Sequence, residues 1–157
     1  MAEIVLFRID DRLLHGQVSK RWLKEVGANT IIVADDKVAG DEETIAIMDV
    51  ATPLGVKSYF LSIKDAIEKL KHLEKDTRAI LLVKNPEMAF KIVDQGLNVD
   101  KINMGNKSRI SESKEIAPSI YLTNEDIGYL KDIENEGVDI IILSLPDDKL
   151  VKFDTIK

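Results

Sequence analysis

The sequence predicts an α/β fold: an open, doubly wound, mostly parallel sheet with helices on both faces. Short apolar runs alternate along the chain with segments whose apolar residues recur every three or four positions, and this alternation of strands and helices is typical of such sheets. The runs are continuous, as expected of parallel strands that are buried on both faces. A length of 157 residues with 45% hydrophobic content suits one domain, over residues 1–157, with a single core.

Each predicted element has a local signal. The predicted strands are the apolar runs at 4–7, 30–34, 56–61, 79–83, 101–104, 120–122 and 138–143, and the tail at 150–153 suits an edge strand. The predicted helices carry an apolar stripe at helical spacing and lie at 18–26, 42–52, 63–73, 86–95 and 124–136. Asp41, Asn85 and Thr123 are the expected N-caps of three of them, and Asp126 completes a capping box with Thr123.

The segment Arg8–Val18 (RIDDRLLHGQV) is expected to form the loop between the first strand and the first helix. Ligands usually bind to loops at the carboxyl ends of strands in open α/β sheets. This loop contains a histidine, His15, close to an arginine, Arg12. An unperturbed imidazole is mostly neutral at pH 7, so one ring nitrogen can attack a phosphorus atom while a partner holds the other. The residue types therefore indicate phosphoryl transfer through His15.

The residues around His15 suggest distinct roles. Arg12 would bind the phosphoryl oxygens, or alternatively form a salt bridge with Asp10 or Asp11. Asp10 is the better candidate for orienting the imidazole, because a carboxylate that accepts the distal N–H fixes the tautomer. A second carboxylate near the phosphoryl group would repel it, so Asp11 is expected to point away or to pair with Arg8.

Further phosphate ligands are expected next to this pair. Gly16 and Gln17 open the first helix and can offer backbone N–H groups to an anion. Arg8 adds a guanidinium, which suits a phosphoryl group.

Other polar segments have two interpretations each. Asp35 and Asp36 follow the second strand and could bind a metal, although solvated turn residues are the simpler interpretation. The basic segment 105–109 (GNKSR) could form the second wall of the site or only a solvated connection. His72 is expected on the surface and Trp22 in the core. No glycine-rich nucleotide motif and no metal-spaced histidine pair are present, so we expect neither a metal nor a cofactor.

The charge of the chain also limits its function. A net charge of -6 argues against nucleic acid as a partner, because nucleic-acid binding needs a basic face. Residues 1–24 nevertheless hold five basic residues against three acidic ones, a local charge of +2 that suits an anionic ligand or an acidic partner surface. The chain has no cysteine, and no apolar run approaches the length of a signal h-region or a membrane span, so we expect a protein of the cytoplasm.

The run Arg8–Val18 closely resembles the signature of the IIB components of the mannose, fructose and sorbose family of the bacterial sugar phosphotransferase system. The likeness continues through Trp22 and segments 31–41, 48–56, 103–105 and 121–123, and it covers essentially the whole domain. One departure follows Gly105, where similar proteins often have a second glycine and this chain has Asn106.

The resemblance implies a protein-Nπ-phosphohistidine–sugar phosphotransferase. In this family, the residue that aligns with His15 accepts a phosphoryl group on its pros nitrogen from a phosphohistidine of the IIA component. It then passes the group to a sugar at the membrane components IIC and IID. The resemblance also implies antiparallel strands toward the sheet edge and a cytoplasmic subunit that associates peripherally with the membrane complex.

The competing interpretation is a regulatory or metabolite-binding α/β module, similar to a receiver domain, without phosphohistidine transfer. Such a domain would also place paired acids after its first strand. It would need an acceptor aspartate at the end of its third strand, and the segment 59–64 (YFLSIK) has none.

Overall fold

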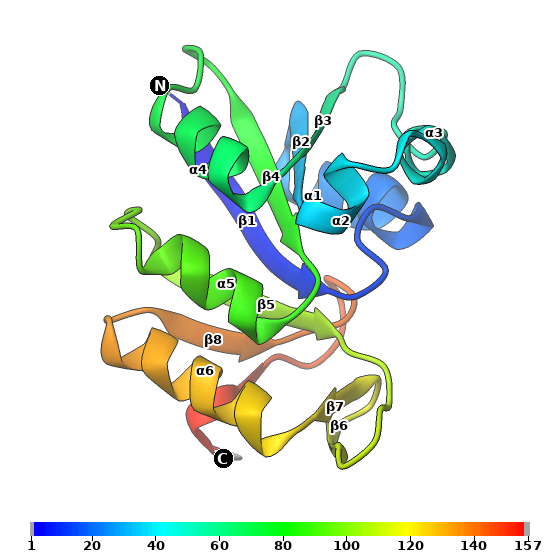
Figure 1. The fold of residues 1–157 in the computed structure, drawn as a ribbon. Helices are drawn as coiled ribbons and strands as arrows, with labels where there is room; N and C mark the ends of the chain where they lie inside the picture. Colours follow the sequence, from blue (N-terminus) through cyan, green and yellow to red (C-terminus); the bar gives the residue numbers. More distant parts are fainter. Residues whose placement is uncertain (1, 156–157) are drawn as a thin grey trace.

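The computed structural model describes residues 2–155 and centres on one twisted sheet (Figure 1). The strands of this sheet are β1 Glu3–Asp10, β2 Thr30–Ala34, β3 Lys57–Leu61, β4 Arg78–Val83, β5 Lys101–Asn106, β8 Asp139–Ile142 and β9 Val151–Lys152. A separate antiparallel pair consists of β6 Lys114–Ala117 and β7 Ile120–Leu122. The helices are η1 Val18–Trp22 (a π-helix), α1 Leu23–Val26, α2 Asp36–Ala39, α3 Glu42–Asp49, α4 Ile63–Lys71, α5 Pro86–Val93, α6 Asn124–Asn135 and η2 Phe153–Thr155 (a 3₁₀ turn).

The topology of the main sheet matches the predicted fold class. Its seven strands lie in the order β3-β2-β4-β1-β5-β8-β9, so β1 is in the middle. The neighbouring strands from β3 to β8 pair in parallel, and β9 pairs antiparallel with β8 at the edge. The predicted mostly parallel sheet with an antiparallel edge strand is therefore confirmed.

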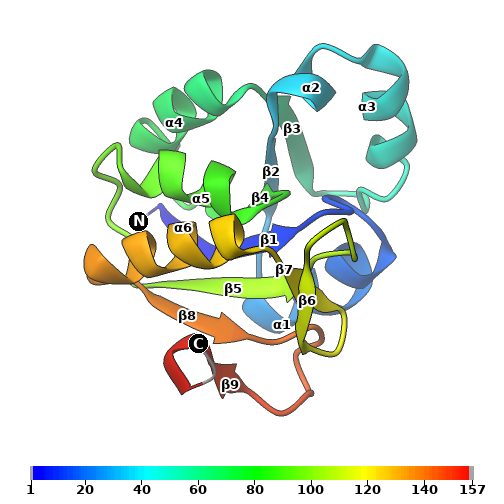
Figure 2. The same ribbon diagram turned by 60° about the horizontal axis from the view of Figure 1, so that its bottom comes forward.

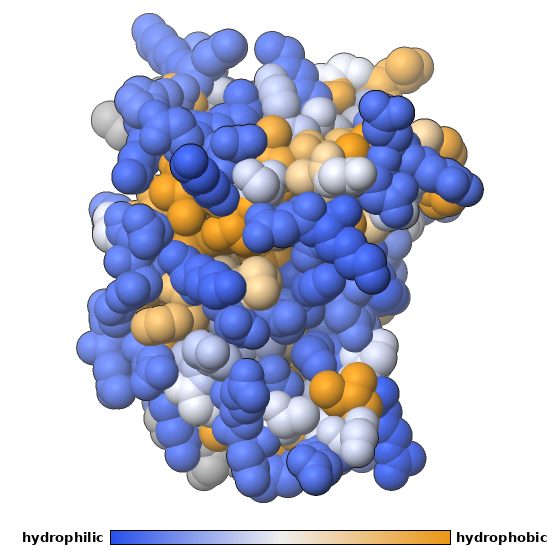
Figure 3. Space-filling model, viewed as in Figure 1, coloured by the Kyte–Doolittle hydropathy of each residue, from blue (hydrophilic) through white to orange (hydrophobic). Residues whose placement is uncertain are grey.

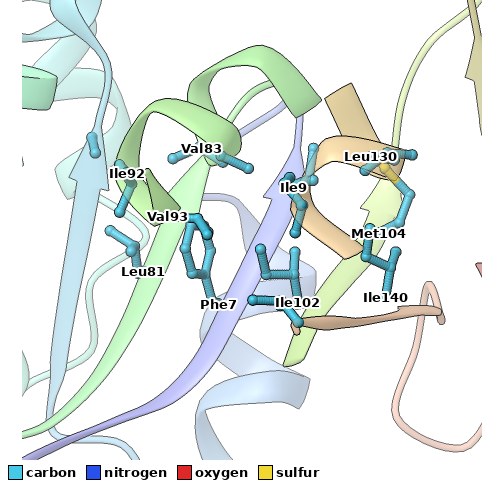
Figure 4. Packing of buried hydrophobic residues seen from close by; sticks show 14 of the residues in the cluster. Phe7, Ile9, Leu81, Val83, Ile92, Val93, Ile102, Met104, Leu130 and Ile140 are labelled. Atoms are coloured by element: carbon cyan, nitrogen blue, oxygen red, sulfur yellow. The ribbon is translucent and has the colours of Figure 1, made fainter. Parts of the chain in front are cut away.

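Helices cover both faces of the sheet. Figure 2 shows α4, α5 and α6 on one face, whereas α1 lies on the other. Side chains of β1 alternate between two apolar clusters, because successive residues of a strand point to opposite faces. Phe7 and Ile9 pack in the cluster under α5 and α6 (Figure 4), and Leu6 packs with Val18 and Trp22 in the cluster under η1.

The predicted helix starts are confirmed. The side chains of Asp41, Asn85 and Thr123 each accept a hydrogen bond from a backbone N–H three residues later. Asp126 completes the predicted capping box by accepting a hydrogen bond from the backbone N–H of Thr123. These caps satisfy N–H groups that have no partner within a helix, so a signal only four residues long is enough to locate each helix start.

The structure differs from the prediction at β1 and at short elements. β1 continues through Asp10, so Arg8 and Asp10 are strand residues and not loop residues. The short elements α2 and β6 were not predicted, since four residues are too few to show a period. The first helix begins as the π-helix η1, which the apolar spacing did not indicate. No helix within residues 2–155 is both long and apolar enough to cross a membrane.

Candidate functional site

The candidate site lies where β1 ends at the carboxyl edge of the sheet. Residues 11–17 connect β1 to η1, and two leucines anchor this loop in the apolar cluster under η1. Leu13 and Leu14 are only 2% and 3% exposed. Leu13 has a φ of 57°, in the left-handed region that a leucine rarely adopts, and its burial holds it there. The loop around His15 is therefore held in one conformation by packing.

Asp10 lies at the centre of the site and is completely buried. Its carboxylate accepts hydrogen bonds from Arg8 Nε and Nη2 at 3.2 and 3.1 Å and from Arg12 Nε and Nη2 at 3.1 Å each. His15 Nε2 lies 2.8 Å from Asp10 Oδ2. Burial alone would raise the pKa of Asp10, but the hydrogen bonds from His15 and Arg12 and the charge of Arg8 outweigh it and lower the pKa to about 2. Asp10 is therefore ionised at neutral pH.

The ionised carboxylate of Asp10 determines which ring nitrogen of His15 carries a proton. A carboxylate can only accept hydrogen bonds, so His15 Nε2 must carry the proton. The other ring nitrogen, Nδ1 (the pros nitrogen), accepts the backbone N–H of Gln17 at 3.3 Å. The side chain of His15 is 18% exposed. The ring therefore presents Nδ1, with its lone pair, next to a backbone N–H group at the helix start.

The structure corrects the expectation that Arg8 binds phosphate. Its side chain is completely buried, and its guanidinium is used by internal partners. Besides Asp10, Arg8 Nη1 donates to Asn103 Oδ1 at 2.6 Å and to the carbonyl oxygen of Leu143 at 3.1 Å. The ring of Trp22 covers the guanidinium, with 5.2 Å between its centroid and Cζ. Arg8 therefore lies behind Asp10 and compensates its charge, so it cannot contact a group bound to His15.

Two residues behind Arg8 could not be assigned from the sequence. Asn103 is buried and links Arg8 to β8 through the Leu143 carbonyl, to which its Nδ2 donates at 2.8 Å. Gly105 leaves room for the guanidinium, since a Cβ atom placed there would lie 2.1 Å from Arg8 Cζ. A sequence signal for part of this arrangement existed: Arg8 and Asp10 are two positions apart next to an apolar run, so a longer strand places both on one face.

Arg12 forms a salt bridge with Asp10, and its position also leaves it able to bind an anion. Its guanidinium forms the expected salt bridge with Asp10, and Nη2 also donates to Gln17 Oε1 at 2.9 Å. None of the described hydrogen bonds uses Nη1, and the side chain is 38% exposed. Asp10 thus fixes the guanidinium beside His15 while one amino group stays accessible to an anion.

Asp11 does not pair with Arg8 and instead connects the loop to β5. Its Oδ1 accepts from Asn106 Nδ2 at 2.8 Å, and its Oδ2 accepts from the backbone N–H of Ser108 at 2.7 Å. Asn106, the residue after Gly105, is thus one of the two partners of this carboxylate. The segment 105–109 therefore lies against the His15 loop, and the interpretation as a solvated connection is wrong.

The basic residues of segment 105–109 divide into two kinds. Lys107 is 7% exposed and lies with its Nζ 3.7 Å from Asp126 Oδ2, so its charge is matched by α6. Arg109 is exposed, and its guanidinium lies 5.9 Å from the centroid of the Tyr121 ring.

The other candidates have structural roles. Asp35 caps α2 through Val38 N–H, is 2% exposed and pairs with Lys84 at 3.4 Å, so it is not a solvated turn residue. Asp36 accepts the backbone N–H of Ile63 at 2.8 Å. The side chain of His72 is 71% exposed, as predicted.

A groove with a volume of about 850 Å³ opens beside His15. Its walls are formed by the His15 loop and the first turn of η1 on one side, and by α3 and the following turn on the other. The charged residues that line it among residues 2–155 are Arg12 and Lys20, and most of the remaining lining is apolar. The groove thus leads to the imidazole of His15, and its walls are partly basic and partly apolar.

Comparisons with known proteins identify the family. Residues 4–156 match the family model "PTS system sorbose subfamily IIB component". The chain is 34% identical over 152 residues to the N-acetylgalactosamine-specific phosphotransferase enzyme IIB component 2 of Escherichia coli (strain K12), covering 96% of each protein. The chain belongs to the sorbose subfamily of PTS IIB components.

Structural and further sequence relatives agree with this membership. The crystal structure of the IIBSor domain of the sorbose permease from Klebsiella pneumoniae superposes with a TM-score of 0.89 at 30% identity, covering 96% of this chain and 93% of that one. The chain is also 28% identical to the mannose-specific EIIAB component of E. coli K12, of which it covers 46%. As a PTS IIB component, this protein is a phosphocarrier in sugar uptake, and the receiver-like interpretation is not favoured. IIB components work with IIA and with the membrane components IIC and IID.

Proposed function

We propose that His15 is the phosphoryl carrier of this IIB component and that it is phosphorylated on Nδ1. The observation that supports this most directly is the 2.8 Å contact between His15 Nε2 and the buried Asp10 carboxylate, which leaves Nδ1 as the nucleophile. The donor is a phosphohistidine of the IIA component, and the acceptor is a sugar at the IIC and IID components. The protein works in the cytoplasm and associates peripherally with that membrane complex.

The transfer from IIA conserves charge and protons within the two imidazoles. The Nδ1 lone pair of His15 forms the new N–P bond as the N–P bond of the donor breaks, and the donor nitrogen recovers its lone pair. Nε2 keeps its proton throughout, because the ionised Asp10 carboxylate accepts a hydrogen bond from Nε2–H. The positive charge that develops on the ring is stabilised by the same carboxylate. In the second step the oxygen of a sugar hydroxyl forms the new O–P bond as the Nδ1–P bond of His15 breaks. The hydroxyl proton is released to water, and the electron pair of the broken bond returns to Nδ1, which restores neutral His15.

The groups around His15 suit the phosphoryl oxygens. Arg12 brings an accessible amino group of a guanidinium that Asp10 and Gln17 hold in place. The backbone N–H groups of Gly16 and Gln17 lie at the start of the helical segment, where partial positive charge favours an anion. Gln17 N–H already contacts Nδ1 and would turn to a phosphoryl oxygen. Arg8 has no direct contact with the phosphoryl group and fixes Asp10.

The test is phosphorylation by the complete soluble relay. The protein is incubated with phosphoenolpyruvate, the kinase of the carrier HPr, HPr and a matching IIA, and its mass is measured. We expect one added phosphoryl group that is stable in alkali and lost in acid, as a phosphohistidine is. His15→Ala should accept none, whereas His72→Ala, with an exposed imidazole, serves as the matched control and should be labelled like the parent.

Three results would contradict the proposal. Phosphate found at His72, undiminished labelling of His15→Ala, or a label that is lost in both acid and alkali would each assign the chemistry to another group. The last of these would indicate an acyl phosphate, the type of bond that a receiver-like domain forms.

A further inference from the structure

Three large apolar side chains lie exposed beside the His15 groove. Ile47, Val50 and Leu54 are 68%, 85% and 103% exposed and lie within eight positions, on the C-terminal part of α3 and the turn that follows it. We call these three residues the apolar shelf. Figure 3 shows apolar side chains at the right-hand edge of the molecule, over α3. The other exposed large apolar side chains of residues 2–155, Ile110 and Leu150, are 52% and 49% exposed.

The apolar shelf contributes little to the fold. No side chain of α3 is buried, and only Ile45 and Met48 pack partly against the cluster under η1. Scattered exposed apolar residues are ordinary, but a contiguous exposed group marks a surface that a partner covers. The fold does not need these side chains to be apolar, so their chemistry is better explained by an interaction.

Two of the three residues of the apolar shelf lie in the groove that also contains His15. Ile47 and Val50 line the same groove as His15, Arg12 and Lys20. A protein that brings a phosphoryl group to His15 Nδ1 must therefore lie over this groove, with the basic residues on one side and the apolar shelf on the other.

The chemistry of the groove selects among the possible partners. A free sugar is rich in hydroxyl groups, whereas the exposed area of the groove lining is mainly apolar despite the polar side chains along it, so the groove fits a protein surface better. The cytoplasmic loops of membrane proteins carry an excess of lysine and arginine, which the basic residues Arg12 and Lys20 would repel. The donor IIA is under no such constraint, and an acidic rim around its phosphohistidine would complement these two residues.

We propose that the apolar shelf is the docking surface for phosphorylated IIA, with Ile47, Val50 and Leu54 in the interface. This inference rests on the proposed function of His15. In a transient complex, the basic residues raise the encounter rate, whereas apolar contact and the exclusion of water hold the two imidazoles together long enough for transfer.

Two phosphoryl donors separate docking from chemistry. Phosphorylated IIA needs a docking surface, whereas phosphoramidate is a small molecule that phosphorylates histidine directly and needs none. We expect the triple variant Ile47→Ser/Val50→Ser/Leu54→Ser to lose about 30-fold in kcat/KM with phosphorylated IIA, on the scale of about 1 kcal/mol or less for each apolar interface residue. Its labelling by phosphoramidate should equal that of the parent, which also shows that the His15 site is folded.

The matched control is the double variant Ile110→Ser/Leu150→Ser, which removes exposed apolar side chains that do not line the groove. We expect it to match the parent with both donors. If the triple variant does not fold, Val50→Ser and Leu54→Ser carry the same test singly, each with an expected loss of about threefold in kcat/KM.

The outcomes distinguish the two proposals. An unchanged kcat/KM of the triple variant with phosphorylated IIA would overturn the docking proposal and leave the function of His15 intact. Normal acceptance from IIA combined with impaired transfer to sugar in membranes containing IIC and IID would assign the apolar shelf to the membrane partner and overturn it as well. A parent protein that neither donor labels would overturn the proposed function, and the docking surface with it.

Discussion

At the scale of single residues, the site depends on how one buried carboxylate is shared. Asp10 accepts hydrogen bonds from Arg8, Arg12 and His15, and its two oxygens satisfy all three side chains. An ionised carboxylate without these partners would be costly to bury, and each partner without Asp10 would lose its orientation. The position of His15 Nδ1 is therefore a property of the whole cluster, and substitutions around Asp10 should affect transfer as well as stability.

Arg12 is expected to act on the phosphoryl group itself. Arg12→Ala should slow transfer from phosphorylated IIA by roughly 10²-fold or more, the scale of losing one charge-stabilising donor. Arg12→Lys should restore only part of the rate. A guanidinium is planar and can bind Asp10 and a phosphoryl oxygen through different N–H groups at the same time, and an ammonium lacks this geometry. Stopped-flow or quenched-flow transfer rates measure both. Equal rates in the parent and both variants would show that Arg12 only supports Asp10.

Gly105 is expected to be intolerant of any side chain. In Gly105→Ala the new Cβ would lie 2.1 Å from Arg8 Cζ and 2.3 Å from Nη1, and Arg8 cannot move without losing its bonds to Asn103 and Asp10. We expect a loss of about 1–3 kcal/mol in the free energy of unfolding, measured with urea, and slower phosphoryl transfer.

Gly128→Ala is the matched control for this substitution, because Gly128 lies in α6 with no atom within 4 Å of its would-be Cβ. This variant should unfold at the same or a slightly higher urea concentration. If Gly105→Ala unfolds like the parent, the guanidinium of Arg8 is not confined as the structure indicates.

At the scale of elements, the site is assembled from one strand end, one loop and one helix start. β1 places Asp10 at the carboxyl edge, Leu13 and Leu14 anchor the loop, and Gln17, directly before η1, places its backbone N–H next to Nδ1. The exposed side of the helix that follows carries Lys20 and Lys24. In the proposed function, the start of this helix would contribute to the anion site and its basic outer surface would set the local field.

Charge reversal on this helix should slow the encounter with IIA. Lys20→Glu/Lys24→Glu is expected to lower the association rate with phosphorylated IIA and to flatten its dependence on ionic strength, because electrostatic steering acts on association. The free energy of unfolding should stay within about 0.5 kcal/mol of the parent, since both side chains are exposed. Stopped-flow transfer at low salt as fast as in the parent would place the steering charges elsewhere, and Arg109 would be tested next.

At the scale of the whole molecule, the strand order brings distant segments together behind His15. β1 lies between β4 and β5, and β8 follows β5, so Asn103 and the Leu143 carbonyl both reach Arg8. The largest apolar cluster fills the opposite face of β1 through Phe7 and Ile9. Global unfolding must therefore expose Asp10, and the stability of the fold is coupled to the ionisation of the site.

Acid should destabilise the protein through Asp10. The pKa of Asp10 is about 2 in the folded protein against an ordinary value of 3.8, so the unfolded chain binds the proton more readily. The stabilisation, about 2 kcal/mol, is fully present above pH 4 and is lost as the pH falls toward 2. Urea unfolding at a series of pH values should show that the parent and Asp10→Asn differ less and less in their free energy of unfolding as the pH falls over this range.

Asp147→Asn is the control for this measurement, because Asp147 is exposed and pairs with Arg21 at the surface. The free energy of unfolding of Asp147→Asn should differ little from that of the parent at every pH. If the difference in this free energy between the parent and Asp10→Asn stays constant down to pH 2, the ionisation of Asp10 is not linked to folding.

The sequence alone determined most of the longer elements of this protein and singled out the segment around His15. The N-caps Asp41, Asn85 and Thr123 and the apolar runs act within a few residues of themselves, so local physical chemistry reveals them. The segment around His15 was recognisable for the same reason, since its imidazole and guanidinium lie close in the chain. The same local signals gave the α/β class and a helix on each side of the sheet.

Only the tertiary structure decided what surrounds that segment. Two partners of Arg8 lie 95 and 135 positions away along the chain, and no local preference encodes which strands become neighbours. Because β5 lies beside β1 and β8 lies beside β5, Arg8 is enclosed as the counter-charge of Asp10 instead of being exposed as a phosphate ligand. Gly105 acquires its role for the same reason, since the space it leaves open exists only when β5 lies against Arg8.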